Sequence, residues 1–215
     1  MKILNFLLDL LYPPRCCFCH RITEKEIICA DCVLKLPYTK ENSKQTKFSY
    51  ISAAVSPLYY KGAVRESLLR YKFHSATGYS EVYGELIAKC IDENKINCDI
   101  ITYVPLSRKR KWLRGYNQAE LIADEVSKLC GIPVVNLLVK VRNNPAQSGI
   151  KSPQKRKENV SGAYKATNVE QIKGNCILII DDIITTGATV SECAKMLRQQ
   201  GSGEVFAASL ARSKE

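Results

Sequence analysis

Residues 176–189, which read CILIIDDIITTGAT, constrain the fold of this 215-residue chain more than any other segment. The apolar run at 177–180 predicts a buried strand that ends at two adjacent carboxylates, Asp181 and Asp182. A small polar loop at 185–189 then leads into a helical pattern. Such a loop presents backbone N–H groups to a phosphate, and carboxylates hold sugar hydroxyls or a bridging Mg²⁺. The segment therefore predicts a sugar-phosphate site.

A buried strand followed by a Thr-capped helix is the simpler interpretation of the same residues, but unpaired acids at the end of a buried strand are costly. The Gly-Lys-Ser/Thr of a Walker A loop and the dinucleotide G-x-G-x-x-G pattern are both absent from the segment. It resembles the phosphoribosyl-pyrophosphate (PRPP) loop of type I phosphoribosyltransferases, with two acids and a Thr-Gly-x-Thr end. The resemblance implies that PRPP contacts Asp181, Asp182, Thr185, Thr186, Gly187, Ala188 and Thr189.

The N-terminal cysteines follow a metal-ligand spacing. Cys16, Cys19, Cys29 and Cys32 form C-x₂-C-x₉-C-x₂-C, two knuckles that suit a closed, structural Zn²⁺ site. Cys17 and His20 are competing ligands that would disturb the knuckle geometry. The chain has ten cysteines and shows no secretory signal, so we expect a cytoplasmic protein with reduced thiols.

Ahead of the cysteines, residues 3–11 have an apolar helical pattern that is too short to span a membrane. Packing on the rest of the protein is favoured over lying on a membrane surface, because the pattern lacks a cationic face. Residues 38–50 are polar and read as a linker. We expect two domains: residues 1–45, with the apolar helix and zinc ribbon, and residues 46–215.

The rest of the chain alternates strand and helix patterns, which predicts an α/β fold with a mostly parallel sheet flanked by helices. Ligands of such sheets sit at the carboxyl ends of the strands, where the two acids fall. Strand patterns cover residues 51–60, 99–104, 176–180 and 205–210, with a further apolar run at 133–138. Helical patterns cover residues 62–73, 81–91, 118–129 and 190–200.

The net charge of +11 suggests polyanionic partners, although a basic but inert surface has about the same support. Two cationic segments, read as loops, are candidates for contacts to pyrophosphate or nucleic acid. The first, residues 104–118, adds Trp112 and Tyr116 as stacking surfaces, with Tyr71 as a third. The second, residues 142–160, reads as a mobile lid. The candidate contacts are Arg108, Arg114, Asn117, Gln118, Gln147 and Arg156, with Asn159 beside them.

The order of these motifs resembles the ComF (ComFC) family. The motifs are the paired knuckles, Tyr60-Lys61-Gly62 leading into Tyr71-Lys72-Phe73, Val104-Pro105-Leu106-Ser107 leading to Arg114-Gly115-Tyr116-Asn117-Gln118, the second cationic segment, and the acid pair with its loop. The resemblance implies a zinc ribbon on a type I phosphoribosyltransferase fold. It also implies a role in natural competence, aiding entry of single-stranded DNA into the cytoplasm, with a competence helicase as a possible partner.

The resemblance does not identify a reaction, and no catalytic residue is assigned. PRPP with Mg²⁺ is the expected ligand. The alternative function is an active phosphoribosyltransferase of nucleobase or nucleotide metabolism, unrelated to DNA uptake. Related purine-salvage enzymes can carry a carboxylate where this chain has Thr185. A threonine cannot act as a general base near neutral pH, so we expect little or no hypoxanthine or guanine transfer.

Overall fold

The computed structural model describes residues 13–24, 26–40, 44–74, 76–144 and 152–213. The predicted apolar helix at 3–11 lies outside them. The strands are β1 (Ala53–Val55), β2 (Leu58–Tyr59), β3 (Ile100–Tyr103), β4 (Leu138–Lys140), β5 (Tyr164–Ala166), β6 (Ile177–Ile184) and β7 (Val205–Arg212). The helices are α2 (Ala30–Lys35), α3 (Gly62–Phe73), α4 (Tyr79–Glu93), α5 (Arg108–Arg114), α6 (Gln118–Cys130), α7 (Pro153–Val160), α8 (Val169–Ile172) and α9 (Ala188–Gln199).

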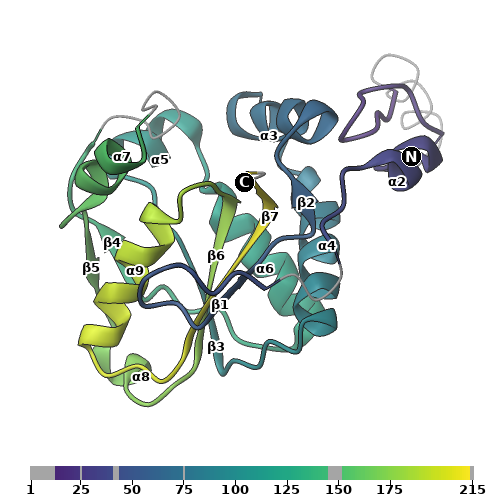
Figure 1. The fold of residues 1–215 in the computed structure, drawn as a ribbon. Helices are drawn as coiled ribbons and strands as arrows, with labels where there is room; N and C mark the ends of the chain where they lie inside the picture. Colours follow the sequence, from purple (N-terminus) through teal and green to yellow (C-terminus); the bar gives the residue numbers. More distant parts are fainter. Residues whose placement is uncertain (1–12, 25, 41–43, 75, 145–151, 214–215) are drawn as a thin grey trace, which may run out of the picture.

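A parallel five-stranded sheet forms the centre of the molecule (Figure 1). Its order is β1-β7-β6-β3, and β2 also pairs with β7, further along the same strand. β4 and β5 form a separate antiparallel pair. The predicted α/β architecture with a mostly parallel sheet is thus confirmed.

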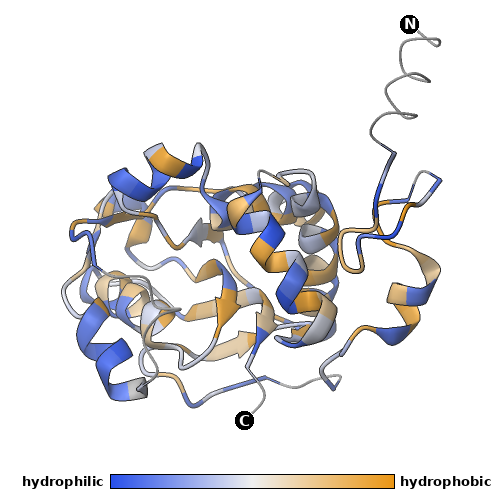
Figure 2. Ribbon diagram, turned by 90° about the horizontal axis from the view of Figure 1, so that it is seen from above, coloured by the Kyte–Doolittle hydropathy of each residue, from blue (hydrophilic) through white to orange (hydrophobic). Residues whose placement is uncertain are grey.

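Helices cover both faces of this sheet. One buried cluster joins the sheet to α3, α4 and α6, and a second joins it to α9 and to the β4–β5 pair. The central strands are largely apolar, whereas the helices carry both apolar and polar residues (Figure 2). This is the distribution expected when strands are covered on both faces and helices bury only one stripe.

Several predicted elements differ from the structure in their bounds. The strand expected at 51–60 is divided into β1 and β2, because Ser56 and Pro57 separate its two pairings with β7. The strand expected at 176–180 continues through both acids to Ile184. The first cationic segment is not a loop, since residues 108–114 form α5. The second contains α7.

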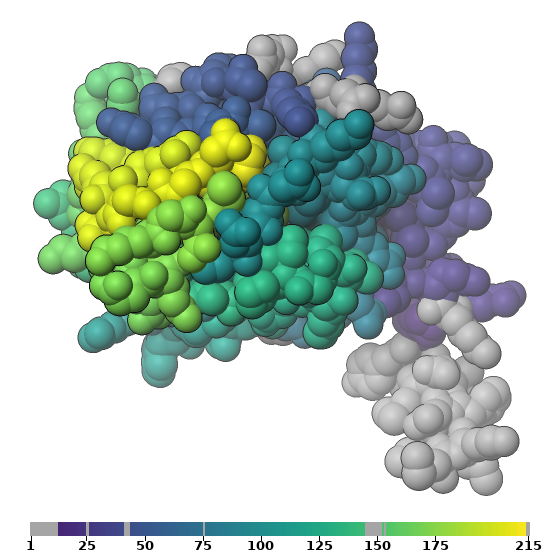
Figure 3. All heavy atoms as spheres, turned by 90° about the horizontal axis from the view of Figure 1, so that it is seen from below, coloured from purple at the N-terminus to yellow at the C-terminus, as the bar shows by residue number. Residues whose placement is uncertain are grey.

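The N-terminal cysteine segment packs against α3 and α4, at one end of the molecule (Figures 1 and 3). Cys16, Cys17 and Phe18 are almost completely buried and belong to the same cluster as Tyr83 of α4. Phe18 and Tyr83 lie 6.1 Å apart between ring centroids. The segment therefore shares a core with the rest of the protein.

Within the described residues, every helix is too short or too polar to cross a membrane.

Candidate functional site

The acid pair lies inside β6, near its carboxyl end. Side chains alternate between the two faces of a strand, so Asp181 and Asp182 point to opposite faces of the sheet. Asp182 faces α3, where it forms an ion pair with Lys72. Asp181 faces β4 and α9, close enough to Lys140 and Cys193 to affect their ionisation. The two carboxylates therefore have different surroundings.

The two acids also differ in how they are neutralised. Burial raises the pKa of Asp181 well above its usual value, and the neighbouring charge of Asp182 adds to this shift. Asp181 Oδ1 accepts a hydrogen bond of 2.8 Å from the backbone N–H of Asp182. Asp182 instead has the ammonium of Lys72 as its counter-ion. A divalent cation or a set of ligand hydroxyls would compensate the cost of ionising Asp181.

The loop after β6 opens directly onto α9, which begins at Ala188, earlier than predicted. Its N-cap is Gly187, with a φ of 72° and no side-chain cap, so the Thr-capped interpretation of this turn is wrong. The N-cap residue therefore gives the first helical turn no side-chain acceptor, and such a helix start suits an anion. A Cβ on Gly187 would lie 2.2 Å from the ring of Phe48, so both backbone conformation and packing require glycine here.

Segments far apart in the sequence meet around this loop in a cleft of about 770 Å³, a size typical of small-molecule sites. Its lining includes both acids and the whole loop from Thr185 to Thr189. Predicted contacts among its other lining residues are Arg114, Asn117, Gln118 and Arg156. Arg108 is exposed and outside this lining, while Gln147 lies outside the described residues.

Two of these predicted contacts have structural partners of their own. Asn117 is buried and caps α6, accepting from the N–H of Ala119 and donating to the carbonyl of Val104, both at 3.1 Å. Gln118 is also buried, and its Oε1 accepts from Arg114. Its Nε2 has no hydrogen-bond partner among the described residues. Both polar atoms of the Asn117 amide therefore have partners, whereas the buried Nε2 of Gln118 has none among the described residues.

The three proposed stacking rings have different environments. Tyr71 is completely buried, and its hydroxyl donates to the carbonyl of Gln118, so its prediction as a base-stacking surface is wrong. Tyr116 is half-buried and donates to the backbone carbonyl of Tyr71. Trp112 is 83% exposed. Leu113, the next residue of α5, and Phe73 are also exposed, and both line the cleft. Arg114 lies 5.4 Å over the Phe73 ring.

Helix α7, which is part of the second cationic segment, contacts the loop that follows β6. Arg156 Nη1 donates to Thr185 Oγ1 at 2.9 Å. The backbone carbonyl of Asn159, at the other end of α7, accepts from the amide of Asn144. Asn144 in turn accepts through its carbonyl from Arg110, at 2.6 Å. Asn144 thus connects α5 to α7, and α7 in turn contacts the loop.

Three side chains that contribute to the site were not assigned from the sequence. Lys72 pairs with Asp182, Lys140 lines the cleft, and Phe48 packs on Gly187. Arg110, one of the cations of the first cationic segment, also lines the cleft. The motif Tyr71-Lys72-Phe73 and the helical pattern around it were the available signal for Lys72. Phe48 comes from the predicted linker, where the sequence gives no indication of a contact with a loop 139 residues away.

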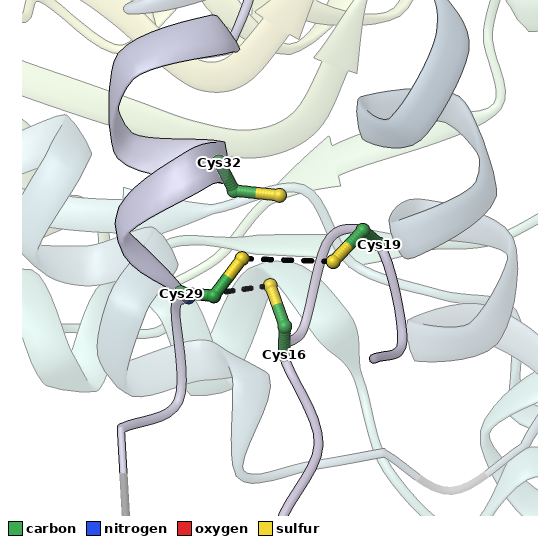
Figure 4. Close-up of side chains that lie close together, drawn as sticks. All are labelled: Cys16, Cys19, Cys29 and Cys32. Carbon is green, nitrogen blue, oxygen red and sulfur yellow. Dashed lines mark hydrogen bonds between the residues drawn. The ribbon is translucent and has the colours of Figure 1, made fainter. Parts of the chain in front are cut away.

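The four predicted metal ligands converge on one point. The sulfur atoms of Cys16, Cys19, Cys29 and Cys32 all lie within 4.8 Å of one another (Figure 4). Those of Cys19 and Cys29 are 3.6 Å apart, and tetrahedral Zn–S bonds of about 2.3 Å require roughly 3.8 Å. Burial opposes ionisation of Cys19, but hydrogen bonds from Arg21, together with those of the Cys32 and Cys16 thiols, outweigh it and lower the pKa of this thiol to about 6. The set fits a structural zinc ion.

The competing ligands are outside this thiol cluster. Cys17 and His20 are not among the clustered groups of the described residues. The carbonyl of Cys17 instead accepts hydrogen bonds from Ser67 and Arg70. The four-cysteine assignment is therefore the one that the geometry supports.

Two family models match separate parts of the chain. A phosphoribosyl transferase domain matches residues 114–215, which contain β6, the loop and α9. A double zinc ribbon domain matches residues 7–43, which contain the four clustered cysteines. The fold is thus a type I phosphoribosyltransferase fold with an N-terminal zinc ribbon, as predicted.

Relatives align with most of the chain. Competence protein F of Haemophilus influenzae is 28% identical, and the alignment covers 92% of this chain and 90% of that protein. Competence protein ComFC of Bacillus subtilis is 26% identical, with 86% and 72% covered. The chain is thus similar over most of its length to two competence proteins. Another relative, DNA utilization protein YhgH of Escherichia coli K12, is 32% identical, but only 50% of this chain and 46% of that protein align.

Solved phosphoribosyltransferase structures are more distant from this chain. Adenine phosphoribosyltransferase from Leishmania tarentolae has a TM-score of 0.43 and 11% identity, covering 80% of this chain and 95% of that chain. Glutamine PRPP amidotransferase from B. subtilis has a TM-score of 0.42 and 23% identity, covering 61% and 26%.

Proposed function

We propose that this protein binds PRPP, or a related phosphoribosyl ligand, in the cleft together with Mg²⁺. The observation that carries the proposal is the junction of β6 and α9. An acid pair, a loop with a left-handed glycine and the uncapped start of a 12-residue helix all line one cleft. The helix start suits a 5-phosphate, and the carboxylates suit ribose hydroxyls and a metal bridging to pyrophosphate.

In this proposal the loop from Thr185 to Thr189 holds the phosphate, and Asp181 and Asp182 hold the ribose and the cation. Arg114, Arg156 and the amide of Gln118 supply positive charge and donors for the pyrophosphate. Calorimetry with PRPP and Mg²⁺ tests it by comparing the wild type with Asp181→Ala/Asp182→Ala. Binding that does not depend on the carboxylates would contradict it.

We further propose that the protein acts in natural competence, in the cytoplasm, by binding incoming single-stranded DNA. Cationic α5 with the exposed rings of Trp112 and Phe73 beside the cleft supports this partner. Backbone charges and stacked bases are the usual basis of binding without sequence choice. A competence helicase remains the expected protein partner.

Anisotropy with a labelled oligonucleotide tests the DNA proposal at low and moderate salt. Affinity should fall steeply with salt, and Trp112→Ala should weaken binding by about 1–3 kcal/mol. Leu129→Ala is a matched control, because Leu129 is 55% exposed near the far end of α6. Affinity that is unchanged by salt, or equal losses in the two variants, would count against DNA as the partner.

An active phosphoribosyltransferase is the second candidate. The contact between Arg156 and Thr185 supports it, because α7 already reaches the loop in the manner of a lid that excludes water. Thr185 still provides no base, so robust formation of inosinate from PRPP and hypoxanthine would contradict our expectation. Pyrophosphate release measured with a series of nucleobase acceptors distinguishes an active transferase from a protein that only binds PRPP.

A further inference from the structure

Helix α3 lies between the cleft and the zinc ribbon and presents opposite faces to them. Arg65, Leu69 and Lys72 line the cleft, at spacings of four and three residues. Ser67 and Arg70 contact the first cysteine knuckle. With 3.6 residues per turn, these two sets point in nearly opposite directions. The same short helix is thus a wall of one site and a support of the other.

The contacts with the knuckle are made to its backbone. Ser67 Oγ donates to the carbonyl of Cys17. Arg70 Nη2 donates to the carbonyls of Cys17 at 3.0 Å and Phe18 at 2.7 Å. Both carbonyls lie in the turn between the ligands Cys16 and Cys19, so any change in that turn moves the acceptors of α3.

The contact of Ser67 with the knuckle is buried, and those of Arg70 are half-buried. Cys17 and Phe18 are 0% and 1% exposed, and Ser67 is linked to the hydroxyl of Tyr83 at 2.5 Å. Arg70 Nε is buried without a hydrogen-bond partner among the described residues, so the two carbonyls carry much of the stabilisation of this guanidinium. A half-buried cation that loses its acceptors destabilises the folded chain. The helix and the knuckle should therefore move together.

We propose that the zinc knuckle fixes the position of α3, and that Arg70 is a positioning residue for the phosphoribosyl site. A knuckle in its ligated geometry holds Arg70 and Ser67, and α3 then places Lys72 against Asp182. Release of the knuckle frees α3 and removes Lys72 from the acid pair. The inference rests on the proposed function only where a phosphoribosyl ligand is used to detect it.

Such coupling is reciprocal, so a ligand in the cleft must stabilise the zinc site by the factor with which the zinc site favours the ligand. The test measures zinc affinity by equilibrium competition with a chromogenic chelator, with and without PRPP and Mg²⁺. We expect PRPP to raise zinc affinity about tenfold in the wild type and to have no effect in Arg70→Met. Lys89→Met, which removes an exposed cation on α4, is the matched control and should behave as the wild type. Equal zinc affinity with and without PRPP in a wild type that binds PRPP would overturn the proposal.

A ligand-free readout separates this inference from the proposed function. Hydrogen exchange of the α3 amides should increase on zinc removal, while β6 and β7 remain protected. If zinc removal also increases exchange in the sheet, the same measurement is made on zinc-loaded Arg70→Met, which loses the contact but keeps the metal. Faster exchange confined to α3 supports the link, and unchanged α3 exchange overturns it. A wild type that fails to bind PRPP yet shows the α3 effect would refute only the proposed function.

Discussion

Lys72 of α3 forms an ion pair with Asp182 of β6 across the cleft, where their side chains are only 24% and 12% exposed. The pair joins a helix that the zinc ribbon supports to the strand that carries the candidate site. A partner this close will compete with a bound cation for Asp182, so the pair also sets how readily the carboxylate meets a ligand.

Lys72→Met should lower stability by about 1–2 kcal/mol, because it leaves a largely buried carboxylate without a counter-ion. This corresponds to a fall in Tm of roughly 2–8 °C for a chain of this size. Lys89→Met, which breaks the more exposed pair with Glu93, should change Tm by less than about 2 °C. Thermal unfolding of both variants checks this, and equal shifts would contradict a special role for Lys72.

Asp181→Asn should stabilise the ligand-free protein near neutral pH, by about 1 kcal/mol, while weakening PRPP binding. Burial raises the pKa of Asp181, so the folded chain keeps this proton to a higher pH than the unfolded chain. The stabilisation from the proton is complete below about pH 4 and is lost as the pH rises through the folded pKa.

The advantage of Asp181→Asn over the wild type should therefore be small near pH 4 and grow toward pH 8. Tm measured across this range checks the sign. A variant that is less stable than the wild type at pH 8 would show that burial of this carboxylate costs nothing.

Gly187→Ala should destabilise the protein by more than the left-handed backbone alone requires. Gly131 has nearly the same φ, 71° against 72°, but a Cβ there meets nothing within 4 Å. Gly131→Ala thus measures backbone strain, about 1–2 kcal/mol, and the excess in Gly187→Ala measures the clash with Phe48. Urea unfolding of both variants gives the two values; equal losses would mean that the Phe48 ring moves away freely.

Cys16→Ala should abolish zinc binding, whereas Cys17→Ala should retain one zinc ion per chain. Of these two residues, only Cys16 belongs to the thiol cluster, whereas Cys17 accepts hydrogen bonds through its backbone carbonyl. Zinc content measured by mass spectrometry of the purified variants distinguishes them. Loss of the metal in Cys17→Ala with Cys16→Ala still loaded would reverse the assignment.

The sequence predicted what depends on local pattern and missed what depends on packing. Residues 176–189 indicated the strand, the acid pair and the loop, because apolar runs and glycine have direct conformational consequences. The extension of β6 through both acids was missed, since β7 supplies pairing partners such as Ser209 for Asp181. From the sequence alone, two charged residues indicate the end of a buried strand. The pairing with β7 shows that the strand continues through them.

The same reason explains the errors around the cleft. The cations of 108–114 read as a loop, although seven residues of good helix-forming character form α5 between Ser107 and Gly115. Tyr71 was expected to face a ligand, but the core formed by α3 and α4 encloses it. Lys72, one residue further, faces the cleft instead. Which side of a helix meets solvent follows from tertiary packing, which motif spacing does not contain.

The central claim is that the β6–α9 junction binds a phosphoribosyl ligand, and calorimetric titration of PRPP with Mg²⁺ tests it most directly. The account predicts one site per chain in the wild type and in Lys89→Met. It predicts affinity reduced about ten- to a hundredfold in Asp181→Asn/Asp182→Asn, since each carboxylate makes charge-assisted bonds. A wild type that binds no PRPP, or a double variant that binds it equally well, would contradict the account.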